Sequence, residues 1–125
     1  MEYPEQALTE KIIGAAIEVH TYWGPGLLES VYEKSMAREL ELRSIEYEQQ
    51  VKLSLIYKGA DVGDGLRLDL IVKGTVVVEL KVVRDFEPIH EAQLLTYMKL
   101  TDCKVGLLIN FNKPTLKEGL KRFVL

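Results

Sequence analysis

Residues 66–83 read LRLDLIVKGTVVVELKVV, and this stretch decides which fold the sequence predicts. Two short apolar runs flank Lys73-Gly74, which is the pattern of a β-hairpin. Both runs are apolar at successive positions, so both faces of the two strands should be covered by other elements. The charged residues inside these runs are therefore the first that need an explanation: Asp69, Glu79 and Lys81.

The length of the hairpin loop decides whether these three side chains can meet. Glu79 and Lys81 are two positions apart on one strand, so they share a face. Asp69 joins them only if the loop contains an odd number of residues, because a two-residue turn would leave Glu79 on the opposite face. We therefore predict a three-residue loop, over residues 72–74 or 73–75, with Gly74 at positive φ.

Helix and strand patterns lie on both sides of the hairpin. We expect helices over residues 8–22, 27–43, 88–100 and 114–125, and strands over residues 47–57 and 104–111. Thr9 is the expected N-cap of the first helix. The segment between the hairpin and the last strand is long enough for a parallel crossover. Together these elements predict a single α/β domain over residues 1–125, with a mixed central β-sheet flanked by α-helices.

Buried charges are costly unless they are paired or bound to a metal ion, which limits what the hairpin charges can do. Two carboxylates that converge across a hairpin repel each other and attract a hard cation such as Mg²⁺ or Mn²⁺. Such an ion can activate water, and Lys81 beside it can orient that water or neutralise charge on a phosphate. An ion pair of Lys81 with Glu79 or Asp69, without a metal, explains the same residues equally well.

Four residues outside this set could contribute to a site. Glu29, in the first turn of the second helix, could add a carboxylate directly or through water, or only complement the helix dipole. Gln93 and Tyr97 are four apart on the third helix and could contact phosphate or hold the strand lysine, or only pack. Arg67 precedes the strand aspartate by two positions and could clamp a phosphate or pair with an acid.

The composition excludes some classes of protein and leaves others open. The formal net charge is −3, which argues against an architectural nucleic-acid binder but not against a metal-dependent enzyme. The single cysteine, Cys103, can form no disulfide within the chain, which agrees with a reducing compartment. We see no signal peptide, and the longest apolar stretches are too short to span a bilayer. We therefore expect a cytoplasmic protein without membrane contact.

Residues 26–32, GLLESVY, match the signature GxxExxY. Further matching segments are His20, Gln50, Tyr57-Lys58-Gly59, Arg67-Leu68-Asp69, Val78-Glu79-Leu80-Lys81, Glu91-Ala92-Gln93 with Tyr97, and Gly106-Leu107-Leu108-Ile109-Asn110-Phe111. Over nearly its whole length the chain resembles the GxxExxY protein family. That family is similar to the PD-(D/E)XK nuclease superfamily, which includes restriction endonucleases.

The resemblance implies a restriction-endonuclease-like core and a role for each matched residue. Asp69 and Glu79 would be metal ligands together with the backbone carbonyl of Leu80, and Lys81 would be the catalytic lysine. Glu29 would be the acid carried by a helix. Gln93 and Tyr97 would form the helix motif that follows the lysine.

These observations favour an Mg²⁺- or Mn²⁺-dependent nuclease that hydrolyses phosphodiester bonds of DNA. One alternative is a non-catalytic module that keeps the nuclease fold and binds nucleic acid or protein. Another is a metal-dependent enzyme that acts on nucleotides or another phosphate ester, which suits a small acidic protein. A catalytic domain of this size would need a homodimer, a partner protein or a structured substrate to find its target.

Overall fold

The hairpin of residues 66–83 lies at the centre of the sheet. In this computed structural model, which describes residues 4–125, β4 (Arg67–Val72) pairs with β5 (Val76–Lys81) in antiparallel register. Val72 pairs with Val76, so the loop has the three residues 73–75. Gly74 has a φ of 67°. Both the odd loop and the positive φ of Gly74 are confirmed.

The remaining strands extend this hairpin into a five-stranded sheet of order β1-β4-β5-β6-β7. β1 (Tyr47–Lys52) runs antiparallel to β4 and forms one edge. α3 (Pro88–Thr101) connects β5 to β6 (Val105–Asn110), which pairs parallel to β5 as the crossover prediction required. β7 (Leu120–Val124) runs antiparallel to β6. The predicted mixed sheet is confirmed.

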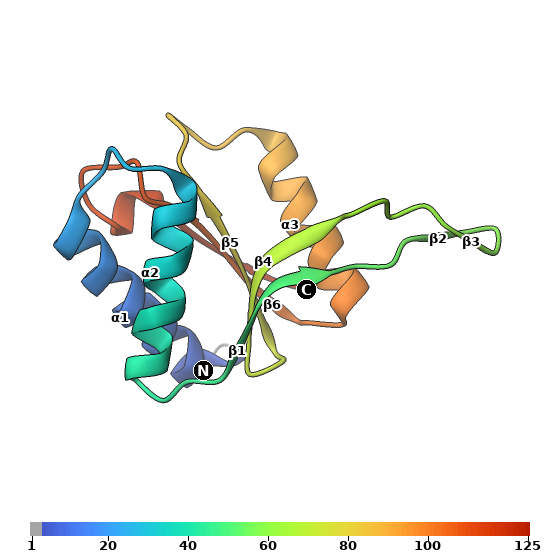
Figure 1. Ribbon diagram of the computed structural model, residues 1–125, viewed down its shortest axis with the longest axis horizontal. Coiled ribbons are helices and arrows are strands. Elements are labelled where there is room, and N and C mark those ends of the chain that lie inside the picture. Colours follow the sequence, from blue (N-terminus) through green and yellow to red (C-terminus); the bar gives the residue numbers. More distant parts are fainter. Residues whose placement is uncertain (1–3) are drawn as a thin grey trace.

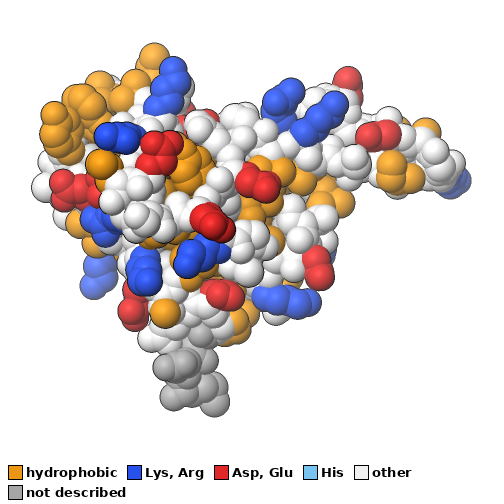
Figure 2. Space-filling model, turned by 60° about the horizontal axis from the view of Figure 1, so that its bottom comes forward, with side chains coloured by type: hydrophobic (Ala, Val, Ile, Leu, Met, Phe, Trp, Pro, Cys, Tyr) orange, Lys and Arg blue, Asp and Glu red, His pale blue; other side chains and the backbone are white. Residues whose placement is uncertain are grey.

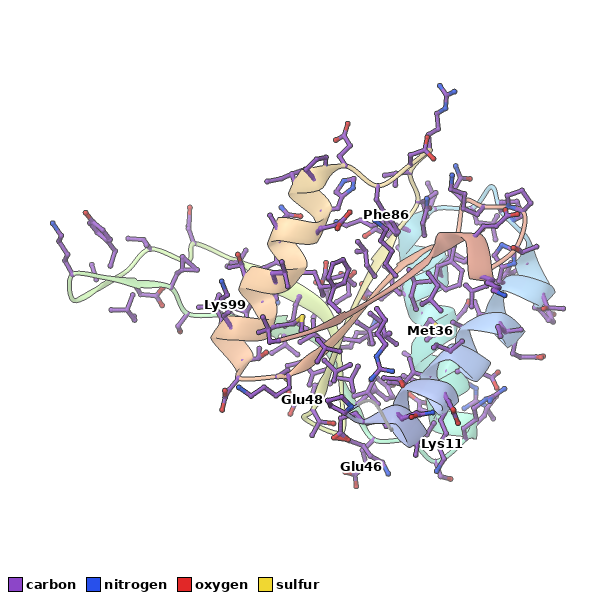
Figure 3. All side chains as sticks on the ribbon, turned by 180° about the vertical axis from the view of Figure 1, so that it is seen from behind. Lys11, Met36, Glu46, Glu48, Phe86 and Lys99 are labelled. Atoms are coloured by element: carbon purple, nitrogen blue, oxygen red, sulfur yellow. The ribbon has the colours of Figure 1, made fainter. Side chains whose placement is uncertain are left out.

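Helices cover both faces of the sheet, as Figure 1 shows. α1 (Gln6–Trp23) and α2 (Glu29–Leu42) pack on one face, where Ile12, Met36 and Leu40 are fully buried against Val78 of β5 and its neighbours. α3 covers the other face with a second buried cluster that includes Leu94 and Met98. Figure 3 shows the side chains that fill both layers. Burial on both faces explains why the strands read as continuous apolar runs.

Two predictions about the chain ends are wrong. α1 begins at Gln6, so Thr9 lies inside the helix and its hydroxyl donates to the Gln6 carbonyl at 3.0 Å instead of capping. The tail forms only a short 3₁₀ turn, η1 (Lys117–Gly119), before β7. Every residue of β6 is buried, and its second edge needs backbone partners that a helix would not supply. The tail supplies those partners as a strand.

The predicted strand over residues 47–57 is interrupted. β1 ends at Lys52, and β2 (Ile56–Tyr57) pairs with β3 (Ala60–Asp61) in a separate small hairpin. We call residues 53–66 the arm, because this segment projects away from the body in Figure 1. Within residues 4–125, no helix combines the length and the apolar character needed to cross a membrane.

Candidate active site

Asp69 and Glu79 lie on facing strands where the central hairpin opens. The antiparallel register would pair them, but the backbone ladder stops one position earlier, at Leu70 and Val78. The Asp69 N–H donates to Glu79 Oε1 at 2.8 Å, and the Leu80 N–H donates to Asp69 Oδ2 at 2.8 Å. Each carboxylate therefore takes an amide from the other strand in place of a ladder bond. The three-residue loop therefore brings the two acids together, as predicted.

The same opening breaks the alternation of side chains along β4. Leu68 packs in the cluster under α3, whereas Leu70, two positions later, packs under α1 and α2. The expectation that Arg67 shares the face of Asp69 depended on strict alternation, and that condition fails between these two leucines. Arg67 lies exposed at the start of β4, opposite Lys52 of β1.

The pKa values of both carboxyl groups lie well above their ordinary values. Burial raises the pKa of Glu79 to about 8, and the negative charge of Asp69 adds to the effect. Burial also raises the pKa of Asp69 to about 6, with a smaller contribution from the charge of Glu33, while the Leu80 N–H acts in the opposite direction. Two acids with little water around them are unfavourable as a pair of anions. A divalent cation would relieve that repulsion.

Lys81 lies two residues after Glu79 on β5 and is partly buried. Its charge lowers the pKa of both Glu79 and Glu29, so it is close to both groups. In the described part of the chain, however, no acid lies within 4.0 Å of its ammonium nitrogen. The direct ion pair that would have explained the three charges without a metal does not form.

α2 contributes two acids to the site, of which the sequence reasoning found one. Glu29 is exposed at the first helical residue, and neighbouring protein raises its pKa by removing water, which Lys81 opposes. Glu33 lies one turn later and forms a hydrogen bond with Asp69. Its carboxylate also accepts from Gln49 Nε2 at 2.7 Å and from Gln50 Nε2 at 2.6 Å. The spacing of four from Glu29 was the available signal, because it puts both acids on one helix face.

Gln50 has the left-handed conformation that L residues rarely adopt, with a φ of 52°. It stands opposite Asp69 on β1, and its Nε2 lies 3.4 Å from Asp69 Oδ1 as well as within reach of Glu33. The amide thus links an acid of α2 to the acid of β4. Strain of this kind is retained where surrounding contacts hold it, often at functional sites.

We expect Gln50→Gly to weaken Mn²⁺ binding about tenfold, because the amide orients two of the acids. The unfolding free energy should stay unchanged or rise by up to about 1 kcal/mol, because glycine accepts positive φ without strain. Calorimetric Mn²⁺ titration and urea unfolding check both parts. Gln49→Ala is the matched control, because Gln49 contacts Glu33 without contacting Asp69. Wild-type Mn²⁺ affinity in Gln50→Gly would contradict the assignment.

The third helix brings one of its two predicted residues to the carboxylates. Tyr97 is buried, and its pKa is raised first by burial and then by the charges of Glu79 and Asp69. Gln93, one turn earlier, is exposed and has no partner among the hydrogen bonds of the described residues. The His90 Nδ1 accepts the Glu87 N–H at 3.0 Å, at the start of the same helix. Tyr97 is therefore part of the wall of the site.

The donor set fits a hard divalent cation that keeps open positions. Among residues 4–125, no three His, Cys, Asp or Glu side chains are placed to hold a metal ion by themselves. Mg²⁺ is usually held by one or two carboxylates, with waters and substrate phosphate completing its shell. Asp69 and Glu79 meet that requirement with oxygen donors alone. The residues present thus suit Mg²⁺ or Mn²⁺ rather than Zn²⁺.

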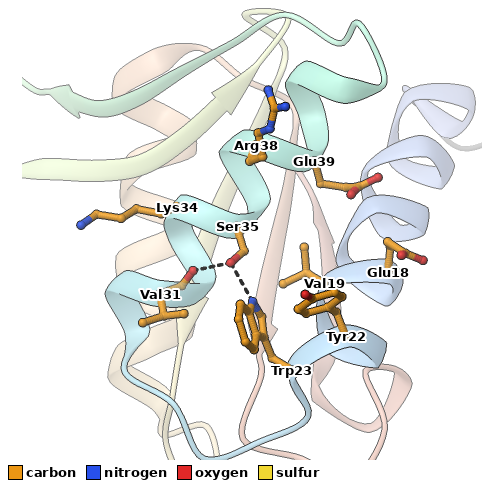
Figure 4. Close-up of a pocket in the computed structure, with 9 residues that line it drawn as sticks. All are labelled: Glu18, Val19, Tyr22, Trp23, Val31, Lys34, Ser35, Arg38 and Glu39. Carbon is orange, nitrogen blue, oxygen red and sulfur yellow. Dashed lines mark hydrogen bonds between the residues drawn. The ribbon is translucent and has the colours of Figure 1, made fainter.

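A pocket of about 410 Å³ lies between α1 and α2, and none of the candidate-site residues lines it. Figure 4 shows that Trp23 and Ser35 lie inside it. The Trp23 indole N–H donates to the Ser35 hydroxyl at 2.9 Å, which in turn donates to the Val31 carbonyl at 2.7 Å. These residues of α2 lie on the helix face away from Glu29 and Glu33. The pocket is therefore separate from the carboxylates.

Comparison with known proteins identifies the family. A protein-family model described as the PD-(D/E)XK nuclease superfamily matches residues 6–123. No curated protein and no solved structure matches the chain at a significant level. The family match confirms the resemblance at the level of the superfamily, together with the restriction-endonuclease-like fold. Membership of the GxxExxY family stays a prediction.

Proposed function

The chain belongs to the PD-(D/E)XK nuclease superfamily, and from this premise we propose that it is a metal-dependent nuclease that hydrolyses phosphodiester bonds of DNA. The observation that supports this most is the Asp69–Glu79 pair, in which Glu79 is buried and Asp69 half-buried where the hairpin opens, with no cation within ion-pair distance among residues 4–125. A structural charge cluster would be neutralised by its own lysine. Here Lys81 lies near the acids but forms no ion pair with any acid that the structure describes.

Each residue has a role that its position supports. Asp69, Glu79 and the backbone carbonyl of Leu80 would hold Mg²⁺ or Mn²⁺, and Glu29 would add a carboxylate at the rim, directly or through water. The bound ion would supply Lewis acidity toward the phosphate and lower the pKa of a water molecule. Lys81 would orient that water and neutralise charge on the phosphate in the transition state.

The third helix would complete the wall around the substrate. Tyr97 lies against the carboxylates, and Gln93 stands one turn away on an exposed position. We assign both to phosphate contact and to positioning Lys81, in keeping with the GxxExxY resemblance. A second copy of the chain, or a partner protein, would provide the second site that cutting both strands requires.

Titration with Mn²⁺ by calorimetry tests the metal site directly. We expect wild-type protein to bind Mn²⁺ and Glu79→Ala to bind at least about tenfold more weakly, because Glu79 supplies one of two carboxylate ligands. Glu46→Ala, which removes an exposed acid outside the site, is the control and should bind as wild type.

Activity is then measured on linear and supercoiled DNA with Mg²⁺ or Mn²⁺. Failure of the wild type to bind Mn²⁺, with and without added DNA, would refute the proposal in favour of a non-catalytic module. Metal binding combined with hydrolysis of nucleotides but not of DNA would identify a phosphoesterase for small substrates. The nuclease proposal predicts instead that the protein degrades intact DNA when Mg²⁺ or Mn²⁺ is present.

A further inference from the structure

Two cations face each other where the arm leaves the body. Lys52, the last residue of β1, pairs directly with Arg67, the first residue of β4. Both side chains are exposed, and neither has an acid within ion-pair distance in residues 4–125. Like charges opposite each other on antiparallel strands destabilise the pairing. A pair of this kind is relieved when an anion binds between its members.

One member of the cationic pair, Arg67, lies on β4, the strand that carries Asp69. Arg67 precedes Asp69 by two residues, which is about 7 Å along a strand. Figure 2 shows Lys and Arg side chains gathered at the base of the arm. Both cationic side chains are long and exposed, so a polyanion with one phosphate at Asp69 would bring a neighbouring phosphate within their reach.

Three exposed apolar side chains near the tip of the arm belong to neither core cluster. Ile56 is 67% exposed, Tyr57 61% and Val62 52%. The Lys58 ammonium lies 5.3 Å from the centre of the Tyr57 ring. A two-stranded ribbon of this kind fits the major groove of B-form DNA, and apolar side chains also insert between base steps from the minor groove.

The pKa of Asp61, one acid of the arm, is lowered most by backbone hydrogen bonds and less by the charge of Lys52, which lies near enough to act on it. Asp61 Oδ1 accepts the N–H groups of Gly63 at 2.9 Å and Leu55 at 3.3 Å, and those bonds lower its pKa. Its carboxylate thus serves the fold of the arm. Asp64 is exposed, so the arm is not a basic surface as a whole. The exposed cations at the base of the arm are Lys52 and Arg67.

We propose that the arm is a duplex-DNA-binding ribbon. Lys52 and Arg67 hold a backbone phosphate next to the one at Asp69, while the apolar side chains near the tip enter a groove farther along the duplex. The inference rests on the proposed function only for the position of the phosphate that is cut. It identifies the substrate as duplex DNA rather than a nucleotide or another small phosphate ester.

Fluorescence anisotropy with a labelled duplex of roughly three helical turns tests the proposal. The measurement uses the full chain in EDTA, so that binding is separated from hydrolysis. We expect K52Q/R67Q to bind about tenfold more weakly, with the slope of log affinity against log salt reduced by about 2. The control K11Q/K117Q removes two exposed cations elsewhere and should stay within about twofold of wild type.

A second variant removes the arm without disturbing the sheet. The Leu53 N–H donates to the Leu66 carbonyl at 2.9 Å, so a two-residue Asn-Gly turn can replace residues 54–65 and close the ladder. This variant should keep cooperative unfolding and lose at least as much affinity for duplex DNA as K52Q/R67Q.

Several results would overturn the proposal. One is equal DNA affinity for K52Q/R67Q and its control, and another is full affinity without the arm. Arm-dependent binding that is equally tight for duplex RNA or single-stranded DNA would assign the arm to a different nucleic acid. If duplex binding depends on the arm but Mn²⁺ supports no cleavage, the nuclease proposal fails and this inference stands. If the armless variant cleaves DNA at the wild-type rate, this inference fails and the nuclease proposal stands.

Discussion

Lys81→Met should lower the rate of DNA cleavage by roughly 10²- to 10³-fold while leaving Mn²⁺ affinity equal to or slightly higher than wild type. The substitution removes the ammonium group that would stabilise charge on the phosphate, which is the usual cost of losing one such group. It also removes a positive charge from beside Glu79 and Glu29, which favours binding of a cation. The backbone should not move, because the Lys81 carbonyl accepts the Phe111 N–H at 3.0 Å within the sheet.

Two further variants make this result specific. Lys81→Arg keeps the charge but presents a planar fork, and it should recover only part of the activity. Lys99→Met removes an exposed cation of α3 and should cleave at the wild-type rate. Single-turnover cleavage of plasmid DNA in Mg²⁺ measures all three. A Lys81→Met enzyme within about threefold of wild type would exclude this lysine from catalysis.

The elements near the hairpin could be predicted because local pattern and burial agree there. An apolar run interrupted by Lys73-Gly74 specifies two covered strands, and the need to bring Asp69 and Glu79 together specifies an odd loop. The tail over residues 114–125 could not be predicted in the same way. The tail forms a strand because β6 has an edge with unpaired backbone groups. That cause lies in another segment, so the tail sequence does not reveal it.

The candidate site also contains residues that the sequence could predict and residues that it could not. Residues inside apolar strands stand out, so Asp69, Glu79 and Lys81 could be named from the sequence. Glu33 lies on a helix rich in charge, and only its hydrogen bonds to Gln49, Gln50 and Asp69 distinguish it from a solvent-exposed acid. The left-handed backbone of Gln50 has no signal in a side-chain pattern at all. The role of Glu33 and the conformation of Gln50 both depend on contacts between segments that are distant in the sequence.

Glu79→Gln should stabilise the metal-free protein at pH 8, although it removes a proposed metal ligand. The pKa of Glu79 is raised from 4.5 to about 8 by burial and by Asp69, so the folded state favours its protonated form. Wild-type stability is therefore complete below about pH 4.5 and is lost as the pH rises through 8. At about 1.4 kcal/mol per pH unit the loss approaches 5 kcal/mol, and relaxation of the site should reduce it to roughly 2–4 kcal/mol.

The glutamine keeps the shape and the hydrogen bond, because its carbonyl can accept the Asp69 N–H as Glu79 does. Urea unfolding in EDTA should therefore show a wild type that weakens between pH 5 and pH 8 and a variant that changes less. Adding Mn²⁺ at pH 8 should restore the wild type and leave Glu79→Gln unaffected, because only the anionic carboxylate gains from the ion. If the variant is the less stable protein at pH 8 in EDTA, burial and Asp69 do not disfavour the Glu79 anion, and the physical reason for a cation beside it is lost.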